Sequence, residues 1–337
     1  MSPKKHTVLV IGCGSIGERH LRGFINTGRA TVTACDVSAA LRQRMTDTYS
    51  VATVDDWEQA LLSGRFSAAA ICTPAHWHVP MATKSLAAGL HTLIEKPLSQ
   101  SLEGVTGLVQ AHARSGVQAA LAYNYHIYPF LSEARDFLLT KELGPIKQVA
   151  VFSGQPFHLF RPAYAQTYYR EHRTGGGAIQ DALTHAANWV ESVVGPTEQV
   201  FCDCAHLVLP GVEVEDTVHI AARHAGVLTI YSLNQFQCPN ETTIQINTAL
   251  GSVKIELHDQ RWGVFRAGDK AWTWHERTVV DRDVHSLVQA NAFLDQVEGK
   301  PAKLCSLSAG LQTLRFNLAA LTSAEKGERV HCADLKY

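Results

Sequence analysis

A lysine stands at Glu95-Lys96-Pro97, directly after an apolar run that is typical of a buried strand. Ligands of open α/β sheets bind outside the carboxyl ends of the strands. A lysine in that place can donate a hydrogen bond to a hydroxyl oxygen and stabilise negative charge as it develops. The proline also favours an extended backbone for Lys96. Taken alone, a solvated lysine paired with Glu95 is the simpler interpretation, so a catalytic assignment depends on residues elsewhere.

A second group of ionisable residues follows three consecutive glycines in the segment 174–188. Asp181 and His185 are four residues apart, so they share one face of the helix predicted over 177–194. The carboxylate raises the basicity of the imidazole and can orient its ring. Oxidation of an alcohol needs a base that takes the hydroxyl proton as hydride leaves, and a histidine suits that role near neutral pH. By itself, a pair with this spacing is more often a surface contact.

The third signal is a glycine-rich segment at the start of the chain, between an apolar run and a helical pattern. Gly12 permits a tight turn, Gly14 lets the backbone approach a pyrophosphate, and Gly17 lets helix and strand pack closely. The helix N-terminus then offers free N–H groups to the phosphates. The predicted dinucleotide-binding loop comprises Gly12, Gly14, Ser15, Ile16 and Gly17.

Asp36 ends the second predicted strand and is the candidate selector of the cofactor. A carboxylate there can accept both ribose hydroxyls of NAD and repels the extra phosphate of NADP. No arginine follows directly, because Val37 and Ser38 come next. We therefore expect NAD rather than NADP. The competing interpretation is that Asp36 caps the following helix.

Strand-like and helical patterns alternate through the first third of the chain, which predicts a parallel sheet covered on both faces. Strands are expected at Thr7–Ile11, Ala30–Cys35, Ala68–Cys72, His91–Ile94 and Gln118–Tyr123, and helices at 17–28, 38–48, Trp57–Ser63, Val79–Ala88 and 101–115.

Strand-like stretches dominate after about residue 125, which predicts a second α/β domain with a large, mostly antiparallel open sheet. We expect domains at 1–124, for NAD binding, and 125–337, for substrate binding and oligomerisation. Strands are expected at 146–153, 197–207, 215–223, 227–236, 241–249 and 252–257, and helices at about 129–139, 177–194, 283–298 and 307–326.

Four motifs occur in the order seen in one known family. They are Gly12/Gly14/Gly17, Thr73-Pro74 with His78, Glu95-Lys96-Pro97, and the triple glycine with Asp181 and His185. On these motifs the chain resembles the glucose–fructose oxidoreductase, inositol dehydrogenase and MocA (Gfo/Idh/MocA) family along nearly its whole length. The resemblance implies an N-terminal Rossmann domain, a C-terminal open-sheet domain, and pairing of those sheets into homodimers or homotetramers.

The resemblance also assigns residues. It implies that the reacting hydroxyl is served by Lys96, Asp181 and His185, with the histidine as acid and base. Residues expected along the cofactor are Thr73, Pro74, His78, Glu95 and Lys96.

The chain departs from the family pattern after the last Rossmann strand. Relatives often show Asn-x-Arg-Phe-x-Pro, whereas this stretch is Asn124-Tyr-His126-Ile-Tyr-Pro. His126 stands in place of a common arginine, which puts in doubt any anionic group bound there. Asn188 also stands where the family often carries Asp or Glu. Tyr123 and His126 remain candidate substrate contacts.

An aromatic and cationic stretch at 157–170 precedes the triple glycine. Arg161 and Tyr164 are candidate substrate contacts there, and the alternative is a loop that packs on itself. Cys202, Cys204 and His206 alternate along a predicted strand. We interpret them as one packed sheet face and assign no metal, with a three-ligand metal site as the alternative.

The chain has 337 residues and a formal net charge of -1, which gives no electrostatic case for nucleic acid or an anionic membrane. The first apolar run is too short to span a membrane, so a cytoplasmic enzyme is expected. We predict an NAD-dependent oxidoreductase that acts on a secondary hydroxyl of a sugar, sugar derivative or cyclitol. One alternative uses transient sugar oxidation for elimination or glycoside cleavage, and another is a non-catalytic NAD-binding sensor.

Overall fold

The structure is a computed structural model that describes residues 5–277 and 282–335. They divide into two compact units. The first unit runs to Ile127 and takes in a later segment that ends at Leu307; the second holds the intervening residues and those from Ser308 onward. The predicted boundaries, 1–124 and 125–337, differ from this division mainly because helix α9 (Arg282–Val297) packs with the first unit.

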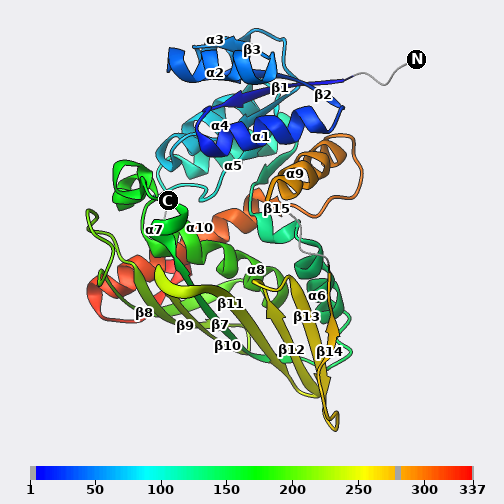
Figure 1. The fold of residues 1–337 in the computed structure, drawn as a ribbon, viewed down its shortest axis with the longest axis vertical. Helices are drawn as coiled ribbons and strands as arrows, with labels where there is room; N and C mark the ends of the chain where they lie inside the picture. Colours follow the sequence, from blue (N-terminus) through cyan, green and yellow to red (C-terminus); the bar gives the residue numbers. More distant parts are fainter. Residues whose placement is uncertain (1–4, 278–281, 336–337) are drawn as a thin grey trace. The chain divides into compact units, whose positions relative to one another are not determined.

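The first unit is built on a seven-stranded sheet in the order β15-β6-β5-β4-β1-β2-β3 (Figure 1). Strands β1 to β6 run parallel, and β15 pairs antiparallel with β6. This is the strand order of doubly wound dinucleotide-binding folds, so the predicted Rossmann domain is confirmed. The strands are β1 His6–Ile11, β2 Ala30–Cys35, β3 Ala52–Val54, β4 Ala68–Ile71, β5 His91–Ile94, β6 Ala119–Leu121 and β15 Cys305–Ser306.

Helices cover this sheet because its central strands are apolar on both faces. Val8, Leu9 and Val10 of β1 are completely buried, as expected of a parallel sheet covered on both sides. The α9 helix packs on the first helix, where the rings of Phe24 and Phe293 lie 6.1 Å apart. The other helices are α1 Ser15–Asn26, α2 Ala39–Tyr49, α3 Trp57–Leu62, α4 His78–Ala87 and α5 Val105–Ser115.

The second unit is built on a nine-stranded sheet in the order β14-β13-β12-β11-β7-β10-β9-β8-β16. Only the β7–β10 pair among these described strands is parallel, so the predicted large and mostly antiparallel sheet is confirmed. The strands are β7 Ile146–Pro156, β8 Thr197–Ala205, β9 Thr217–His224, β10 Val227–Asn234, β11 Phe236–Thr248, β12 Gly251–Glu256, β13 Arg261–Arg266, β14 Thr273–His275 and β16 Val330–His331.

One face of the larger sheet packs against helices. Tyr231 of β10 contacts Phe316 of α10, with ring centroids 5.5 Å apart, and Trp262 of β13 contacts Phe137 of α6. The strands alternate buried and exposed residues, which is typical of a sheet covered on one side. The helices of this unit are α6 Pro129–Leu139, α7 Phe157–Phe160, α8 Thr184–Val194 and α10 Leu307–Lys326.

The helix predicted over 177–194 is not regular throughout. Residues Ile179–Leu183 form a π-helical turn that leads directly into α8. Such turns are rare and occur frequently at functional sites. Asp181 lies within this turn, and His185 lies in the first turn of α8.

Candidate active site

The carboxyl ends of five parallel strands in the first unit lie in one row. The strand register aligns their last residues, which are Leu121, Ile94, Ile71, Ile11 and Cys35. The residues that follow these strand ends include the predicted groups Tyr123, Glu95, Lys96, Thr73, Gly12 and Asp36. The structure therefore brings these residues to one edge of the sheet, where ligands of such folds bind.

The glycine-rich loop joins β1 to α1 and fits a dinucleotide. Gly12 has a φ of +90°, and a Cβ there would lie 2.8 Å from the carbonyl oxygen of Cys72. A Cβ at Gly17 would lie 1.7 Å from the carbonyl oxygen of Gly12, whereas the space around a Cβ at Gly14 is open. The N-terminus of α1 carries no side-chain cap, and Ser15 is exposed. Backbone N–H groups at this terminus can therefore face the pyrophosphate of NAD.

Asp36 is held beside this loop by two backbone amides. Its Oδ2 accepts a hydrogen bond from the N–H of Cys13 at 2.7 Å, and its Oδ1 accepts one from Ser38 at 2.8 Å. A carboxylate has about four acceptor positions, so capacity for ribose hydroxyls remains. The N-cap of α2 is Ser38, whose hydroxyl accepts the N–H of Leu41. Asp36 is thus not the cap residue itself.

Glu95 fixes the turn that carries Lys96. Its Oε1 lies 2.7 Å from Nε2 of His20 on α1, and its Oε2 accepts the N–H of Lys96 at 3.0 Å. Burial acts to raise the pKa of Glu95, but the hydrogen bond and electrostatic interaction with His20, together with the positive charge of Lys96, outweigh it and lower the pKa. The carboxylate therefore stays ionised and links the lysine turn to α1. Sequence reasoning did not identify His20, because nothing in its helix pattern signals a partner 75 residues away.

His78 ties two neighbouring turns together. It is 1% exposed, and its ring nitrogens lie 2.7 Å from the carbonyl oxygen of Thr73 and 2.8 Å from that of Pro97. Burial lowers the pKa of His78 despite these two carbonyl acceptors. The ring nitrogens are directed at the backbone, so His78 fixes the turn of Thr73 and Pro74 relative to the turn of Lys96. His126, in the turn after β6, is also buried.

Asp181 and His185 lie on the same helical segment of the second unit, and both are partly exposed. The hydroxyl of Tyr168 donates a hydrogen bond to Oδ1 of Asp181 at 2.9 Å. Tyr168 lies in the aromatic and cationic stretch 157–170, together with the predicted substrate contacts Arg161 and Tyr164. Its exposed ring and its contact with Asp181 make Tyr168 a stronger candidate for a substrate contact than those two residues.

The two predicted substrate contacts of this stretch, Tyr164 and Arg161, differ in burial. Tyr164 is 6% exposed, and its hydroxyl donates to the carbonyl oxygen of Pro210 at 2.7 Å. Its ring belongs to a small apolar cluster with Phe157 and Tyr169, so it packs the loop on itself. Arg161 is half-buried, with a guanidinium nitrogen 3.5 Å from the carbonyl oxygen of Phe160.

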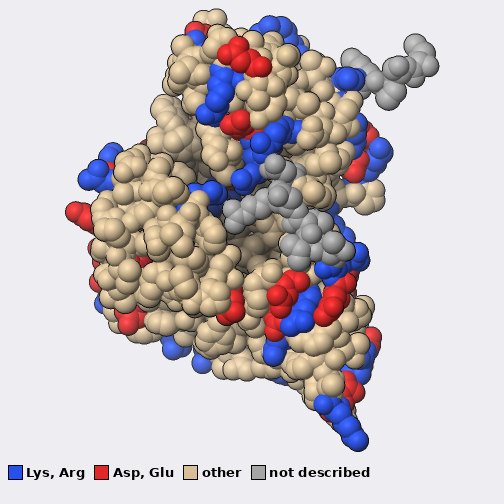
Figure 2. Space-filling view, viewed as in Figure 1, with Lys and Arg blue, Asp and Glu red and all other residues tan. Residues whose placement is uncertain are grey.

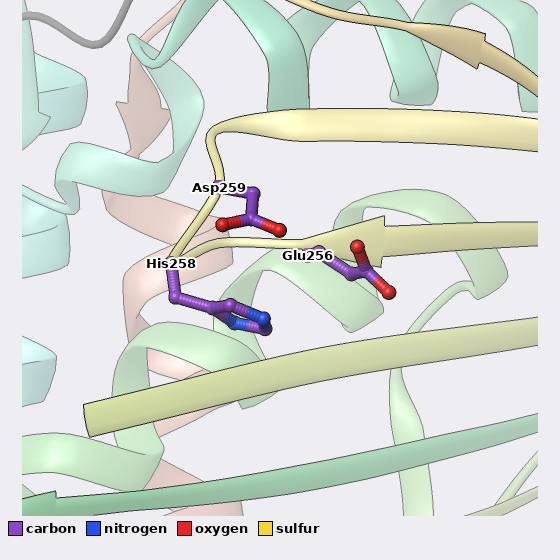
Figure 3. Close-up of side chains that lie close together, drawn as sticks. All are labelled: Glu256, His258 and Asp259. Atoms are coloured by element: carbon purple, nitrogen blue, oxygen red, sulfur yellow. The ribbon is translucent and has the colours of Figure 1, made fainter. Parts of the chain in front are cut away.

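One side-chain group within the described ranges has the spacing of metal ligands, namely Glu256, His258 and Asp259 at the end of β12 (Figure 3). Arg261 donates to the carboxylate of Glu256 at 2.7 Å and pairs with Asp259 at 3.3 Å. This arginine pairs with both carboxylates of the group. The alternative three-ligand metal site consists of Cys202, Cys204 and His206. The two cysteines lie two residues apart on β8, but a ring nitrogen of His206 is directed at the carbonyl oxygen of Leu209.

Charge is mixed on the described part of the surface in view. Figure 2 shows acidic and basic side chains in small groups separated by uncharged areas. Among residues 5–277 and 282–335, no helix has the length and apolar character of a membrane span.

Two family models match the chain. Residues 6–123 match the GFO/IDH/MocA model described as an oxidoreductase family with an NAD-binding Rossmann fold. Residues 131–254 match the GFO/IDH/MocA C-terminal domain. Together they span most of the chain.

The individual relatives share about a quarter or less of their aligned residues with this chain. D-glucoside 3-dehydrogenase of Escherichia coli (strain K12) is 20% identical over 343 residues, covering 96% of this chain and 96% of that protein. The uncharacterized oxidoreductase YrbE of Bacillus subtilis (strain 168) is 24% identical over 204 residues, covering 60% of this chain and 58% of that protein. A solved levoglucosan dehydrogenase, in complex with NADH and levoglucosan, has a TM-score of 0.89 at 18% identity, covering 98% of this chain and 100% of that chain. This structural likeness shows the shared fold.

Proposed function

Because the chain belongs to the GFO/IDH/MocA oxidoreductase family, we propose that it is an NAD-dependent dehydrogenase of sugars, sugar derivatives or cyclitols. It transfers a hydride between the nicotinamide and a secondary hydroxyl or the corresponding ketone. The observation that carries the proposal is the row of strand ends in the first unit, which gathers the glycine loop, Asp36 and Lys96 at one sheet edge. The full-length relative that acts on D-glucosides supports the substrate class.

Three residues carry the proposed chemistry. The ammonium of Lys96 donates a hydrogen bond to the hydroxyl oxygen and stabilises negative charge as it develops. An imidazole nitrogen of His185 takes the hydroxyl proton, and Asp181 raises the basicity of that ring. Bound NAD supplies the acceptor for the hydride. In the reverse direction His185 returns the proton to the carbonyl oxygen.

NAD is the proposed cofactor in preference to NADP. The carboxylate of Asp36 is fixed by the amides of Cys13 and Ser38 at the end of β2. It offers acceptors to ribose hydroxyls and opposes a phosphate in the same place. The eight cysteines are free thiols, which fits the reducing cytoplasm in which we propose that the enzyme works.

The enzyme is proposed to assemble as a homodimer or homotetramer through the face of the large sheet opposite its helices. Phe201, Ala221, Ile230 and Ala150 are register partners in one row across β8, β9, β10 and β7. Phe201 is 41% exposed and Ile230 is 42% exposed, with Phe152 and Leu228 also exposed. Apolar patches of this kind mark interfaces in soluble proteins.

A substrate panel tests the proposed activity. The purified protein is mixed with NAD, and separately with NADP, and offered inositols, aldoses, anhydrosugars and simple glycosides while nicotinamide absorbance is followed. A steady rise with NAD and one substrate group supports the dehydrogenase. New product without net NADH would point instead to internal oxidation followed by elimination. NAD binding with neither signal would contradict the proposed activity on these substrates.

A further inference from the structure

Glu215 is a buried carboxylate that the proposed chemistry does not use. It is 4% exposed and immediately precedes Asp216 and strand β9. Its Oε1 accepts the N–H of Ile179 at 2.8 Å, and its backbone carbonyl oxygen accepts the N–H of Ala178 at 3.0 Å. One residue therefore caps the first two amides of the helical segment that carries Asp181 and His185. A carboxylate is also favoured there by the positive end of the helix dipole.

The glycine run before this segment permits the approach of Glu215. Gly177 has a φ of +92°, and a Cβ there would lie 2.6 Å from both carboxylate oxygens of Glu215. A Cβ at Gly176 would lie 2.2 Å from the carbonyl oxygen of Tyr169. The glycines thus serve close packing of a loop and a carboxylate against the start of the helical segment.

The second oxygen of Glu215 holds the loop that contacts Asp181. Nε2 of His172 lies 2.5 Å from Oε2 of Glu215. The same loop supplies the hydroxyl of Tyr168 to Asp181, and the side-chain amide of Gln180 donates to the carbonyl oxygen of His172 at 3.2 Å. The loop is therefore joined to the helical segment through two carboxylates, those of Asp181 and Glu215.

We propose that Glu215 and His172 are positioning residues that hold Asp181 and His185 in place for the reacting hydroxyl. The inference rests on the proposed function, because it assumes that Asp181 and His185 act on substrate. Neither Glu215 nor His172 needs to touch the sugar. Their role is to fix the first helical turn and the Tyr168 loop together.

The pair makes this arrangement dependent on pH. The hydrogen bond to Glu215 raises the pKa of His172 above its ordinary 6.5, against the opposing effect of burial. Cys204 interacts electrostatically with both His172 and Glu215, and Tyr169 interacts electrostatically with Glu215 and Asp216. Because the folded pKa is raised, the stabilisation is complete below pH 6.5 and is lost as pH rises through the raised value.

Glu215→Gln tests the role of the charge, with Glu213→Gln as the matched control, since Glu213 is exposed two residues earlier. With the panel sugar that reduces NAD fastest, we expect kcat to fall about ten- to a hundredfold in Glu215→Gln, with the Kd for NADH unchanged. His172→Gln is a second variant at a half-exposed side chain. It should remove the alkaline decline of kcat that the pair causes. A Glu215→Gln enzyme with the kcat of the control would overturn the proposal.

A second measurement needs no substrate. In protein labelled with ¹⁵N-histidine, the His172 resonance is identified by its loss in His172→Gln. We expect its titration midpoint above 6.5 in the unmodified chain and lower in Glu215→Gln, together with faster amide exchange at Ile179. Unchanged titration and exchange would overturn the pairing. If no sugar is oxidised but these shifts occur, the proposed function fails while the pairing stands.

Discussion

Nε2 of His20 lies 2.7 Å from Oε1 of Glu95, and this contact joins the helix of the glycine loop to the turn of Lys96. The other oxygen of Glu95 accepts the backbone N–H of Lys96. One buried carboxylate thus sets the cofactor loop and the candidate catalytic lysine relative to each other within the first unit. A substitution of His20 or Glu95 is therefore expected to disturb both the glycine loop and the turn of Lys96.

His20→Ala is expected to lower the free energy of unfolding by about 2 kcal/mol, because the buried carboxylate of Glu95 loses its side-chain hydrogen-bond partner. Urea unfolding measures the change. His6→Ala is the matched control, since His6 pairs with the more exposed Glu298 at 3.0 Å, and such pairs contribute about 1 kcal/mol or less. Equal losses in the two variants would show that burial of the His20 pair has no special effect.

Lys96→Ala is expected to lower turnover by at least about a hundredfold, the scale of one electrostatic or proton-transfer group. Binding of NAD should largely survive, because the glycine loop and Asp36 are untouched. Steady-state kinetics and fluorescence titration with NADH separate the two effects. Lys84→Ala, at an exposed lysine paired with Glu58, should leave both unchanged. Turnover of Lys96→Ala at the unmodified rate would remove Lys96 from the site.

Asp36→Ala is expected to weaken the binding of NAD more than the binding of NADP. The substitution removes acceptors for the ribose hydroxyls of NAD, and it also removes a charge that repels the extra phosphate of NADP. Calorimetric titration of both cofactors gives the ratio of the two Kd values. Asp55→Ala serves as a control at an exposed aspartate. If the ratio in Asp36→Ala equals that in the control, the carboxylate serves only the hydrogen bonds to Cys13 and Ser38.

Ile230→Lys is expected to dissociate the assembly, because it places a charge in the centre of the exposed apolar row of the large sheet. Sedimentation velocity compares its mass with that of the unmodified chain. Leu62→Lys changes an equally apolar exposed residue on α3 of the first unit and should leave the mass unchanged. A monomeric parent protein, or an Ile230→Lys variant with the parent mass, would contradict pairing through this face.

Most of the first unit was predictable because its signals are local, although the short edge strands β3 and β15 were not predicted. The apolar strands fix the parallel register, and that register alone places Gly12, Asp36 and Lys96 at one edge. The four motifs likewise sufficed to predict the family, and the two matching family models confirm that prediction.

The second unit was less predictable because its contacts are distant in sequence. Strands β13 and β14 lack a clear apolar alternation, and the π-helical turn uses residues that suit an α-helix equally well. Glu215 reaches Ile179 across 36 residues, and no spacing rule connects them. The return of α9 to the first unit also depends on helix packing that the pattern of its own residues does not specify.

Isotope transfer from the sugar tests whether the enzyme moves a hydride from a sugar carbon to NAD. The sugar that reduces NAD in the panel is prepared with deuterium on the carbon that bears each secondary hydroxyl in turn, and the NADH formed is analysed by mass spectrometry. We expect one labelled position to yield deuterated NADH, and Lys96→Ala to slow its formation. Unlabelled NADH from every labelled position would contradict hydride transfer from a carbon that bears a secondary hydroxyl.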